Sequence, residues 1–561
     1  MNKEKTKKIQ AKKIHGKNNN QRKKQVSNFN YYDIIGLVII IFLGIIIYSN
    51  SFDCSFHFDD KGRIVENTNI RNLSDFKAIW NYGKPRFVPY FTFALNYHFG
   101  NLDVWGYHLF NLIIHLINAC LVWWLTMLIF SSPNIKNLPI ARQSKAIAFF
   151  TALLFVSHPL ATQSVTYIVQ RMASLAALFY FLSLALYIKA RLLDKSHPSK
   201  YVLFACSLIS ALIAIFTKEN ALTLPFAIIL FDLFFLQKKM PSINLKDYRV
   251  VLFLFAIFSF ILIVILFFSF KILKPLTPDE HNDFKTITSM NYLFTEFRVI
   301  IKYLQLLVLP INQNLDYDFQ ISNNFFELRT MLSFLFLLAL IILAIFLFNK
   351  NRIVSFCIFW FFLTLTIESS FIPISDLINE HRTYLPSFGF FLIISLFINL
   401  LFWDKYKYIA IFIFALIIGS NSYLTYERNK IWKDDFTLWS NVLSNSPNKA
   451  RAYFGLGFAY GRENKFEEAM KNFNKAIELQ PRYPDVYNNR GIIFGMEKKY
   501  DESISNFNKA IELKADYPEA YFNRGLTYFN IGKKEIACGD LQKAAAMGHL
   551  TAIEMYNKFC R

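Results

Sequence analysis

Long apolar segments alternate with short polar ones along the chain up to about residue 430. A helix needs about 20 mainly apolar residues to cross a bilayer, and several of these segments approach or exceed that length with few charges. The pattern therefore predicts a polytopic bundle of membrane-spanning helices. We expect about eleven spans, at Ile34–Tyr48, Tyr107–Phe130, Ala146–Val156, Met172–Ile188, Tyr201–Phe216, Ala221–Phe235, Val250–Phe270, Met331–Phe348, Ile353–Phe371, Tyr384–Trp403 and Tyr408–Tyr423.

The segment Asn291–Pro310 is also largely apolar, but it contains three charged residues, Glu296 among them. We expect it to form an amphipathic helix that lies flat at the membrane interface rather than a span. If it lies flat, the basic loops at 349–352 and 404–407 both face the cytoplasm, as the positive-inside rule prefers, whereas a span would place both outside. The charge pattern therefore favours eleven spans and a C-terminus outside the cytoplasm.

The composition changes after Trp439, and from there residue types recur every 34 positions. Aromatic, glycine and alanine positions all keep this period: Tyr453, Tyr487 and Tyr521; Gly457, Gly491 and Gly525; Ala476, Ala510 and Ala544. This period, with small residues where two helices pack closely, is typical of tetratricopeptide (TPR) repeats, whereas a generic helical bundle would not keep it. We expect three repeats over Asn448–Gly548 and a capping helix over His549–Arg561.

These patterns predict an all-α protein in three parts. Residues 1–30 form a disordered, basic cytoplasmic tail, residues 31–430 a polytopic transmembrane domain, and residues 431–561 a TPR domain, which is an α-solenoid. Within the transmembrane domain, residues 51–105 are expected to form a long loop between the first two spans.

The net charge of +21 would suit a nucleic-acid-binding protein, but its distribution indicates a membrane protein. Ten Lys and Arg residues and one acid lie between Lys3 and Lys24, shortly before the first span. A basic tail in this place is the positive-inside signal, and it can also contact anionic membrane lipids. We therefore expect no nucleic acid among the partners. We expect a multi-pass protein of the inner (cytoplasmic) membrane, with a cytoplasmic N-terminus and an extracytoplasmic TPR domain.

The six cysteines contain no Cys-x-x-Cys pair, so a zinc site is not expected. Cys538 begins the second helix of the third repeat, and Cys560 ends the following helix, which should run antiparallel to it. This placement predicts a disulfide between them if the domain lies in an oxidising compartment. The alternative is a pair of buried, inert thiols.

A polar stripe runs along the second span, where His108, Asn111, His115 and Asn118 lie three or four residues apart and share one helix face. Such a stripe on a transmembrane helix normally faces the protein interior. It indicates either hydrogen bonds between helices or the lining of a polar cavity.

Two adjacent acids, Asp59 and Asp60, follow the first span, where carboxylates usually lie in a water-filled cavity if they face the apolar phase at all. Cations come from several loops and helix ends on the same side: Arg63, Arg86, Arg171, Lys218 and Arg382. A carboxylate can take a proton from a hydroxyl, and Arg and Lys can hold a phosphate as it leaves. The set therefore suits a cleft with a base on one side and an anion-binding group on the other.

Two simpler interpretations stay open. The two aspartates can be solvated loop residues, and Lys218–Glu219 and Glu380–Arg382 can be local ion pairs that fix their loops.

A set of short motifs occurs in a fixed order before the repeats: Phe58-Asp59-Asp60 with Asn67; Arg86-Phe87-Val88-Pro89 with Leu95-Asn96-Tyr97; Gly106-Tyr107-His108 with Asn111 and His115; His158-Pro159 through Tyr167 to Arg171; Lys218-Glu219; and Glu380-His381-Arg382-Thr383-Tyr384-Leu385-Pro386-Ser387. In this order they resemble the transmembrane-and-TPR-containing O-mannosyltransferases and their bacterial relatives, within the GT-C class of membrane glycosyltransferases. The resemblance covers the chain from about residue 31 to its end, and the chain looks like a bacterial-type member.

The resemblance implies a GT-C-like bundle that transfers a sugar from a polyprenyl-phosphate donor to a protein hydroxyl or to another envelope acceptor such as a glycolipid. It implies a catalytic carboxylate from the acidic motif, Asp59 or Asp60, and donor-phosphate contacts from Arg171, Lys218 and Arg382. Further polar residues are expected to line or support the cavity: Arg86, His108, His158, Glu219 and Glu380.

Two positions depart from the pattern of the family. Gln163 stands where relatives tend to have a glutamate, and His381 interrupts the usual Glu-Arg pairing. These departures leave the sugar and the acceptor open. No cofactor is identified, and a carboxylate pair without a third ligand gives little support for a divalent metal, so metal dependence is left open.

The TPR domain is expected to bind the acceptor or a protein partner through its concave surface. The alternative from another class is a non-catalytic, membrane-anchored TPR scaffold for envelope assembly.

Overall fold

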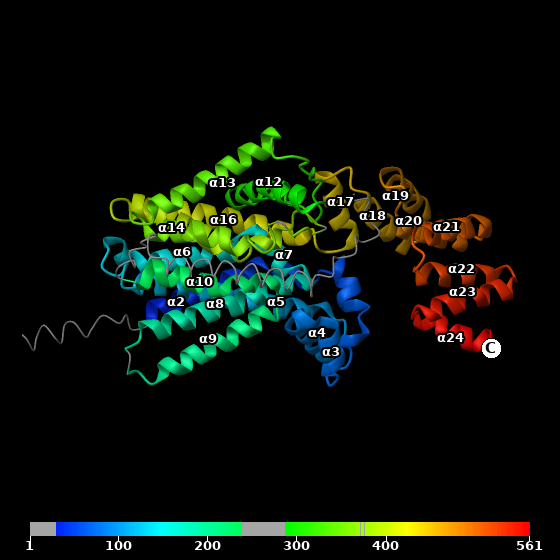
Figure 1. Ribbon diagram of the computed structural model, residues 1–561, viewed down its shortest axis with the longest axis horizontal. Helices are drawn as coiled ribbons and strands as arrows, with labels where there is room; N and C mark the ends of the chain where they lie inside the picture. The colour runs from blue at the N-terminus through cyan, green and yellow to red at the C-terminus, as the bar shows by residue number, and fades with distance from the viewer. Residues whose placement is uncertain (1–29, 195, 238–286, 371, 375, 561) are drawn as a thin grey trace, which may run out of the picture.

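The computed structural model describes residues 30–194, 196–237, 287–370, 372–374 and 376–560, and Figure 1 shows two parts that lie end to end. One part is a bundle of long helices, and the other is a solenoid of short helix pairs. Within the described ranges every regular element is helical, so the predicted all-α class is confirmed.

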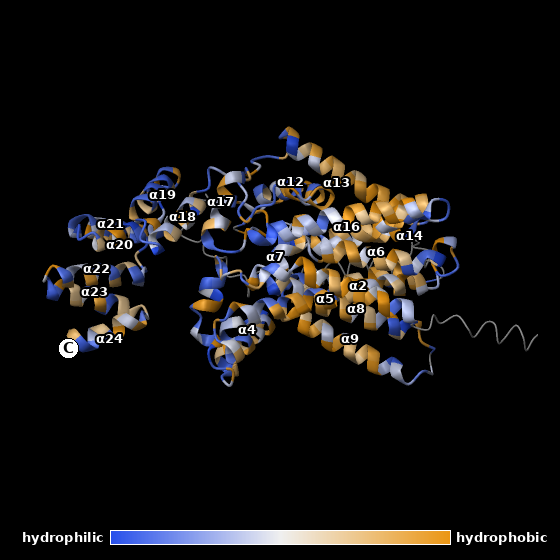
Figure 2. Cartoon of the chain, turned by 180° about the vertical axis from the view of Figure 1, so that it is seen from behind, coloured by the Kyte–Doolittle hydropathy of each residue, from blue (hydrophilic) through white to orange (hydrophobic). Residues whose placement is uncertain are grey.

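Ten of the expected spans correspond to helices in the bundle. They are α2 (Tyr31–Ile47), α5 (Val104–Ser131), α6 (Ser144–Ser157), α8 (Arg171–Leu192), α9 (Ser199–Ile215), α10 (Leu224–Phe231), α13 (Leu328–Leu347), α14 (Arg352–Leu365), α15 (Ser387–Ile398) and α16 (Lys407–Lys430). With their flanking turns, seven are long and apolar enough to cross a membrane, and three are shorter apolar helices. Figure 2 shows that hydrophobic residues gather on this bundle and not on the solenoid. The expected span Val250–Phe270 lies outside the described residues.

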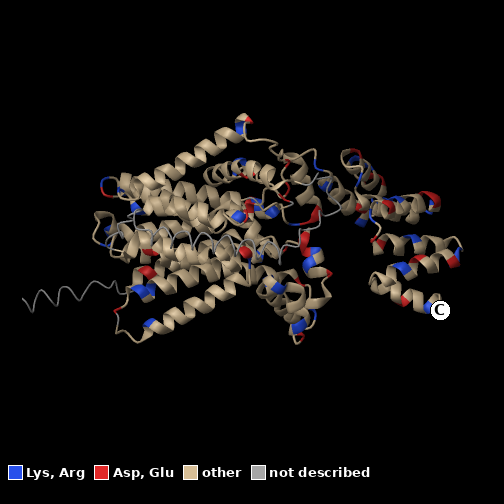
Figure 3. Ribbon diagram, in the orientation of Figure 1, with Lys and Arg blue, Asp and Glu red and all other residues tan. Residues whose placement is uncertain are grey.

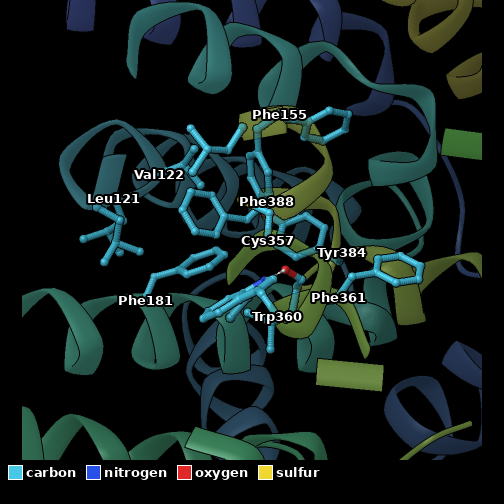
Figure 4. Close-up of a cluster of buried hydrophobic side chains, with 14 of the residues drawn as sticks. Leu121, Val122, Phe155, Phe181, Cys357, Trp360, Phe361, Tyr384 and Phe388 are labelled. Atoms are coloured by element: carbon cyan, nitrogen blue, oxygen red, sulfur yellow. Dashed lines mark hydrogen bonds between the residues drawn. The ribbon is translucent and has the colours of Figure 1, made fainter. Parts of the chain in front are cut away.

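The centre of the bundle is packed by aromatic side chains from distant parts of the chain (Figure 4). Trp360 is fully buried and donates a hydrogen bond from its indole nitrogen to the carbonyl oxygen of Leu385, over 3.1 Å. Its ring packs against those of Phe181 and Phe388. Burying large rings is strongly favourable, and the buried Trp N–H is satisfied, so this cluster fixes α8, α14 and α15 relative to one another.

The segment expected to lie flat forms helix α12 (Ser289–Val308), which packs against α13. Its charged residues keep it out of the set of candidate spans, and one face is buried, including Tyr292, Glu296 and Tyr303. The orientation of α12 relative to a membrane stays a prediction.

The expected long loop at 51–105 was predicted wrongly, since it contains helices α3 (Phe76–Gly83) and α4 (Phe87–Gly100). Asp75 begins α3 by accepting a hydrogen bond from the backbone N–H of Ala78, over 2.9 Å. This N-cap satisfies one of the free amides at the start of the helix. The two helices pack against each other at the same end of the bundle as the solenoid.

The solenoid begins with α17 (Asp435–Asn445) and continues through paired helices. They are α18 (Ala450–Arg462), α19 (Phe466–Leu479), α20 (Pro484–Met496), α21 (Tyr500–Leu513), α22 (Pro518–Asn530), α23 (Lys534–Ala546) and α24 (Leu550–Phe559). The repeated glycines allow close packing within each pair: a Cβ at Gly457 would lie 2.6 Å from the ring of Phe473. The equivalent Cβ at Gly491 would lie 2.8 Å from Phe507. The repeats and the final capping helix therefore occur where the period predicted them.

The predicted disulfide is present, because Cys538 of α23 and Cys560 at the end of α24 are bonded. It closes a loop with a sequence separation of 22 residues and holds the capping helix on the last repeat.

We expect Cys560→Ala to lower the free energy of unfolding of the TPR domain by about 2–4 kcal/mol, because the open chain gains conformational freedom when the loop is no longer closed. Thermal unfolding of the native chain and of this variant, each with and without reductant, measures the effect. The free Cys206→Ala variant is the control. An unfolding temperature of the native chain that does not respond to reductant would contradict the prediction.

Candidate functional site

A cavity of about 600 Å³ lies where the bundle meets the solenoid. Its walls come from the acidic motif after α2, from loops at 315–319 and 376–378, and from α17, α18 and the turn after α19. Charged residues, which are sparse in the middle of the bundle, gather at this junction (Figure 3). Four sequence regions far apart in the chain thus form one polar site.

Of the two acids in the motif, Asp59 is the one that lines this cavity. About a third of its side chain is exposed (32%), and its Oδ2 lies 3.3 Å from Nε of Arg63. Burial raises the pKa of Asp59, and the neighbouring Arg63 opposes that rise. The carboxylate is therefore accessible and has a cation next to it.

The backbone around Asp59 is held in an unusual conformation. Phe58 has a φ angle of +43°, which a bulky residue rarely adopts. The backbone N–H of Asp59 donates a hydrogen bond to the hydroxyl oxygen of Tyr167, over 3.0 Å. Strained residues of this kind often occur at functional sites, where the surrounding structure enforces them.

Asp60 points the other way and is fully buried. Its Oδ2 accepts a hydrogen bond from the backbone N–H of His57 (3.0 Å), and its Oδ1 accepts one from that of Val169 (2.7 Å). Burial raises the pKa of Asp60 to about 7, although both hydrogen bonds oppose the rise. The structure thus separates the two predicted acids: Asp59 faces the cavity, and Asp60 anchors its loop to the segment before α8.

This raised pKa predicts a pH dependence of stability. An aspartate in an unfolded chain has a pKa of about 3.9, so the folded state binds the proton more tightly. The stability that Asp60 contributes is fully present below about pH 4 and is lost as the pH rises through about 7. We expect Asp60→Asn, which cannot ionise, to show a smaller decrease of unfolding temperature between pH 5 and pH 8 than the native chain. Equal decreases in both proteins would contradict this assignment.

One carboxylate of the solenoid binds residues on both sides of Asp59 and Asp60. Asp435, at the start of α17, lies with Oδ1 2.9 Å from Nδ1 of His57 and with Oδ2 2.6 Å from Nζ of Lys61. Burial would raise the pKa of Asp435, but the His57 hydrogen bond and the Lys61 charge lower it to about 2. Asp435 is thus held as a carboxylate that positions Asp59, a role for which the sequence analysis found no signal.

We expect Asp435→Asn to lower the turnover proposed below by about ten- to hundred-fold, because small displacements of a catalytic group are costly. Initial rates and the unfolding temperature of the same preparation test this, and Asp435→Glu should recover most of the rate. The matched control is Asp434→Asn, which makes the same change at the neighbouring residue, whose side chain caps α17 by accepting a hydrogen bond from the backbone N–H of Thr437. A rate loss no larger than that of the control would contradict the positioning role.

Three cations lie near His381, and none of them is among the residues that line the cavity. Lys218 has Nζ 2.6 Å from Oε1 of Glu368, and Arg86 binds Glu219 through two hydrogen bonds of 2.8 and 3.0 Å. Burial lowers the pKa of His381 well below its ordinary value, and the charges of Lys218, Arg382 and Arg86 lower it further. Lys218, Arg382 and Arg86 are thus all close enough to His381 to favour its neutral form.

Arg382 is buried and binds protein groups on two sides. It donates hydrogen bonds to the carbonyl oxygens of Leu377 (3.0 Å) and Asp376 (2.7 Å), and its Nη1 lies 3.8 Å from Oε1 of Glu296. It therefore holds the 376–378 loop, which lines the cavity.

The charged residues that could form local ion pairs instead bind partners from other segments of the chain. Lys218 pairs with Glu368 instead of Glu219, and Glu219 pairs with Arg86. Arg382 pairs with Glu296 instead of Glu380. These pairs join distant segments, so they hold the helix ends around the cavity together.

Glu380 and Gln163 support the loop at 313–317. Glu380 accepts hydrogen bonds from the side chain of Gln313 (2.9 Å), from the backbone N–H of Asn314 (2.7 Å) and from the hydroxyl of Tyr317 (2.7 Å). Burial raises the pKa of Glu380. Gln163 donates a hydrogen bond to the carbonyl oxygen of Asn314 over 3.3 Å and accepts one from the backbone N–H of His381 over 3.2 Å.

Arg171 does not line the cavity. It is fully buried, and it donates hydrogen bonds to Oδ1 of Asn111 (2.6 Å), to Oγ1 of Thr92 (3.1 Å) and to the carbonyl oxygen of Tyr107 (3.0 Å). Its guanidinium also lies over the ring of Phe93. The geometry favours a structural role for Arg171 over a contact with the donor phosphate.

The histidines expected near the cavity make hydrogen bonds within the bundle. His108 contacts the carbonyl oxygen of Cys54 (2.9 Å), and His158 contacts that of Leu307 (3.2 Å). Farther along the polar stripe of α5, His115 lies 2.7 Å from the hydroxyl of Tyr384, and Asn118 donates to the carbonyl oxygen of Ser174. The stripe therefore joins segments by hydrogen bonds, as the first interpretation of it predicted.

Within the described ranges, no three His, Cys, Asp or Glu side chains are grouped so that they could hold a metal ion.

A TPR-repeat family model matches residues 462–496 and 497–532.

Over longer stretches the chain is similar to three animal proteins. Protein O-mannosyl-transferase F38B6.6 of Caenorhabditis elegans is 28% identical, over 80% of this chain and 63% of that protein. Protein O-mannosyl-transferase Tmtc3 of Drosophila melanogaster is 25% identical over 78% of this chain and 54% of that protein. Protein O-mannosyl-transferase TMTC3 of Homo sapiens is 23% identical over 77% of this chain and 50% of that protein.

The chain thus spans between a half and two thirds of the length of these relatives. Among solved structures, the crystal structure of MamA matches 25% of this chain and 79% of its own, with 23% identity and a TM-score of 0.19. Because the relatives named here come from animals, the bacterial-type assignment stays a prediction. Over about four fifths of its length, this chain is similar to proteins named protein O-mannosyl-transferases.

Proposed function

We propose that this chain is an integral-membrane glycosyltransferase that moves one sugar from a polyprenyl phosphate to a hydroxyl group of a protein. The observation that carries this proposal is the position of Asp59, an accessible carboxylate on the wall of a 600 Å³ cavity, with Arg63 at 3.3 Å and Arg86 close enough to lower its pKa. The names of the similar proteins support the same class of reaction. The apolar helices would hold the site at a membrane surface, where a lipid-linked donor is found.

In the proposed reaction Asp59 accepts the proton of a Ser or Thr hydroxyl. The hydroxyl oxygen forms a bond to the anomeric carbon of the sugar, and the bond between that carbon and the phosphate oxygen breaks. The electron pair of the broken bond leaves with the phosphate, so negative charge develops on the polyprenyl phosphate. Cations placed in advance at that position stabilise the leaving group.

Lys218, Arg382 and Arg86 are the proposed phosphate contacts. Each is near a carboxylate, so a bound phosphate would have to share or replace that partner. Lys218 has donors left for a phosphate, because its Nζ is buried and, apart from the ion pair with Glu368, has no hydrogen-bond partner among the described residues. Arg171 is left out of this set, because it is fully buried and each of its three guanidinium nitrogens already donates a hydrogen bond to the protein.

The test is transfer by the purified full chain in lipid vesicles. We expect labelled sugar from at least one polyprenyl-phosphate sugar, among mannose, glucose and N-acetylhexosamine forms, to appear on a protein acceptor. Asp59→Asn, prepared in the same way, should not transfer it. Absence of transfer with every donor and with a mixed set of envelope proteins, from a folded preparation, would favour the membrane-anchored scaffold instead. The sugar, the specific membrane and the side on which the TPR domain lies are separate predictions.

A further inference from the structure

The first TPR repeat forms part of the wall of the cavity that contains Asp59. Trp439 of α17, Phe454 and Phe458 of α18, and Tyr483 before α20 all line this cavity. Phe58, directly before Asp59, packs against these residues: its ring lies 6.0 Å from that of Trp439 and 5.1 Å from the guanidinium of Arg451 of α18. The cavity would therefore be incomplete without the solenoid.

The charges on the cavity wall are mainly acidic. Five aspartates and three cations line it. The cations are already paired: Arg451 lies 3.1 Å from Oδ1 of Asp376, Lys449 lies 3.0 Å from Oδ1 of Asp316, and Lys61 is held by Asp435. Asp318, by contrast, is exposed at the cavity. The surplus of carboxylates favours a cationic occupant and disfavours an anionic one.

Charges of both signs lie close to Asp59. Arg63, Arg451 and Arg86 lie close enough to lower the pKa of its carboxyl, and Asp376 lies close enough to raise it. An anionic phosphate suits Arg63 and Arg86, which are not among the residues that line the cavity, whereas a basic polymer with apolar groups suits the cavity wall itself. Aromatic rings bind apolar side chains and stack with cationic ones.

We propose that this cavity binds the acceptor as a short polypeptide segment in which the reacting Ser or Thr is flanked by basic and aromatic residues. The inference rests on the proposed function, because Asp59 is the base for that hydroxyl. The cavity volume of about 600 Å³ lies in the range of ligand sites, about 300–1,000 Å³, and holds only a few residues. The first repeat thus selects the acceptor at the point of reaction, in addition to any binding along the rest of the solenoid.

Peptide binding without a donor tests the proposal. The probe is a fluorescent nine-residue peptide with a central Thr flanked by Lys and Phe, and its matched partner carries Glu in place of each Lys. We expect the basic peptide to bind the purified full chain at least ten-fold more tightly in a fluorescence anisotropy titration at low salt. Asp318→Lys should weaken that binding at least five-fold. The control is Asp516→Lys, which makes the same charge change in an exposed loop of the solenoid away from the cavity.

Equal binding of the two peptides, or equal effects of the two variants, would overturn the acceptor proposal. Because no donor is present, this result is independent of catalysis. Selective binding without any transfer would overturn the proposed function and leave a basic-peptide site. Transfer without selective binding would leave the function and overturn this inference.

Discussion

Asp59→Asn should lower the turnover number by about 10²–10⁴-fold, the usual contribution of general base catalysis. The asparagine keeps the size of the side chain but cannot accept the proton of the acceptor hydroxyl. The side chain is partly exposed and contacts Arg63 at 3.3 Å, so its loss should change stability by less than about 1 kcal/mol. Initial rates at saturating donor and acceptor, with the unfolding temperature of the same preparation, measure both effects.

Asp60→Asn is the matched control for this experiment. Its side chain is buried and accepts two backbone hydrogen bonds, and an asparagine amide must point its NH₂ group at one of these donors. We expect a loss of about 1–3 kcal/mol in stability and a much smaller loss of turnover at temperatures where the variant is folded. If Asp60→Asn removed turnover and Asp59→Asn did not, the assignment of the two acids would be reversed.

Lys218→Met should raise the KM for the donor at least ten-fold and also destabilise the chain by about 3–5 kcal/mol, because Glu368 is left as a buried charge without its cation. Both side chains of the pair are largely buried, with 7% and 10% exposed. A loss of activity from this variant alone would not separate donor binding from folding.

The double variant Lys218→Met with Glu368→Met makes that separation. Replacing both members of a buried pair by apolar side chains of similar size is often neutral for stability. We expect the unfolding temperature to return close to that of the native chain while the donor KM stays high. Recovery of KM together with stability would assign Lys218 a structural role only.

The fold could be predicted from the sequence where a single local pattern determines it. Hydropathy located ten helices of the bundle, because an apolar segment of sufficient length has few other stable arrangements. The 34-residue period located the repeats, since glycines such as Gly457 and Gly491 must accommodate a ring of the partner helix. The helix positions in turn placed Cys538 near Cys560.

The helices between the first two spans were not predicted, although a signal was present. Asp75 precedes Phe76, Ile79 and Trp80, which is an N-cap residue followed by apolar positions at helical spacing. Because the segment between the two spans is long and polar, it was predicted as a loop in spite of this pattern.

The candidate site could be predicted only in part, because its pairings depend on the packing of distant segments. Lys218 stands next to Glu219 in sequence, but the two side chains bind Glu368 and Arg86 respectively. Nothing local distinguishes Asp59 from Asp60. The difference arises from the backbone N–H of Val169, which binds only Asp60, and from the cavity wall of the solenoid.

The most direct measurement is a structure of the full chain with a polyprenyl phosphate bound. We expect the phosphate within hydrogen-bond distance of at least two of Lys218, Arg382 and Arg86, with Asp59 between the phosphate and the cavity beside the first repeat. A phosphate that binds away from all three cations and on the side of the cavity away from Asp59 would contradict the proposed function.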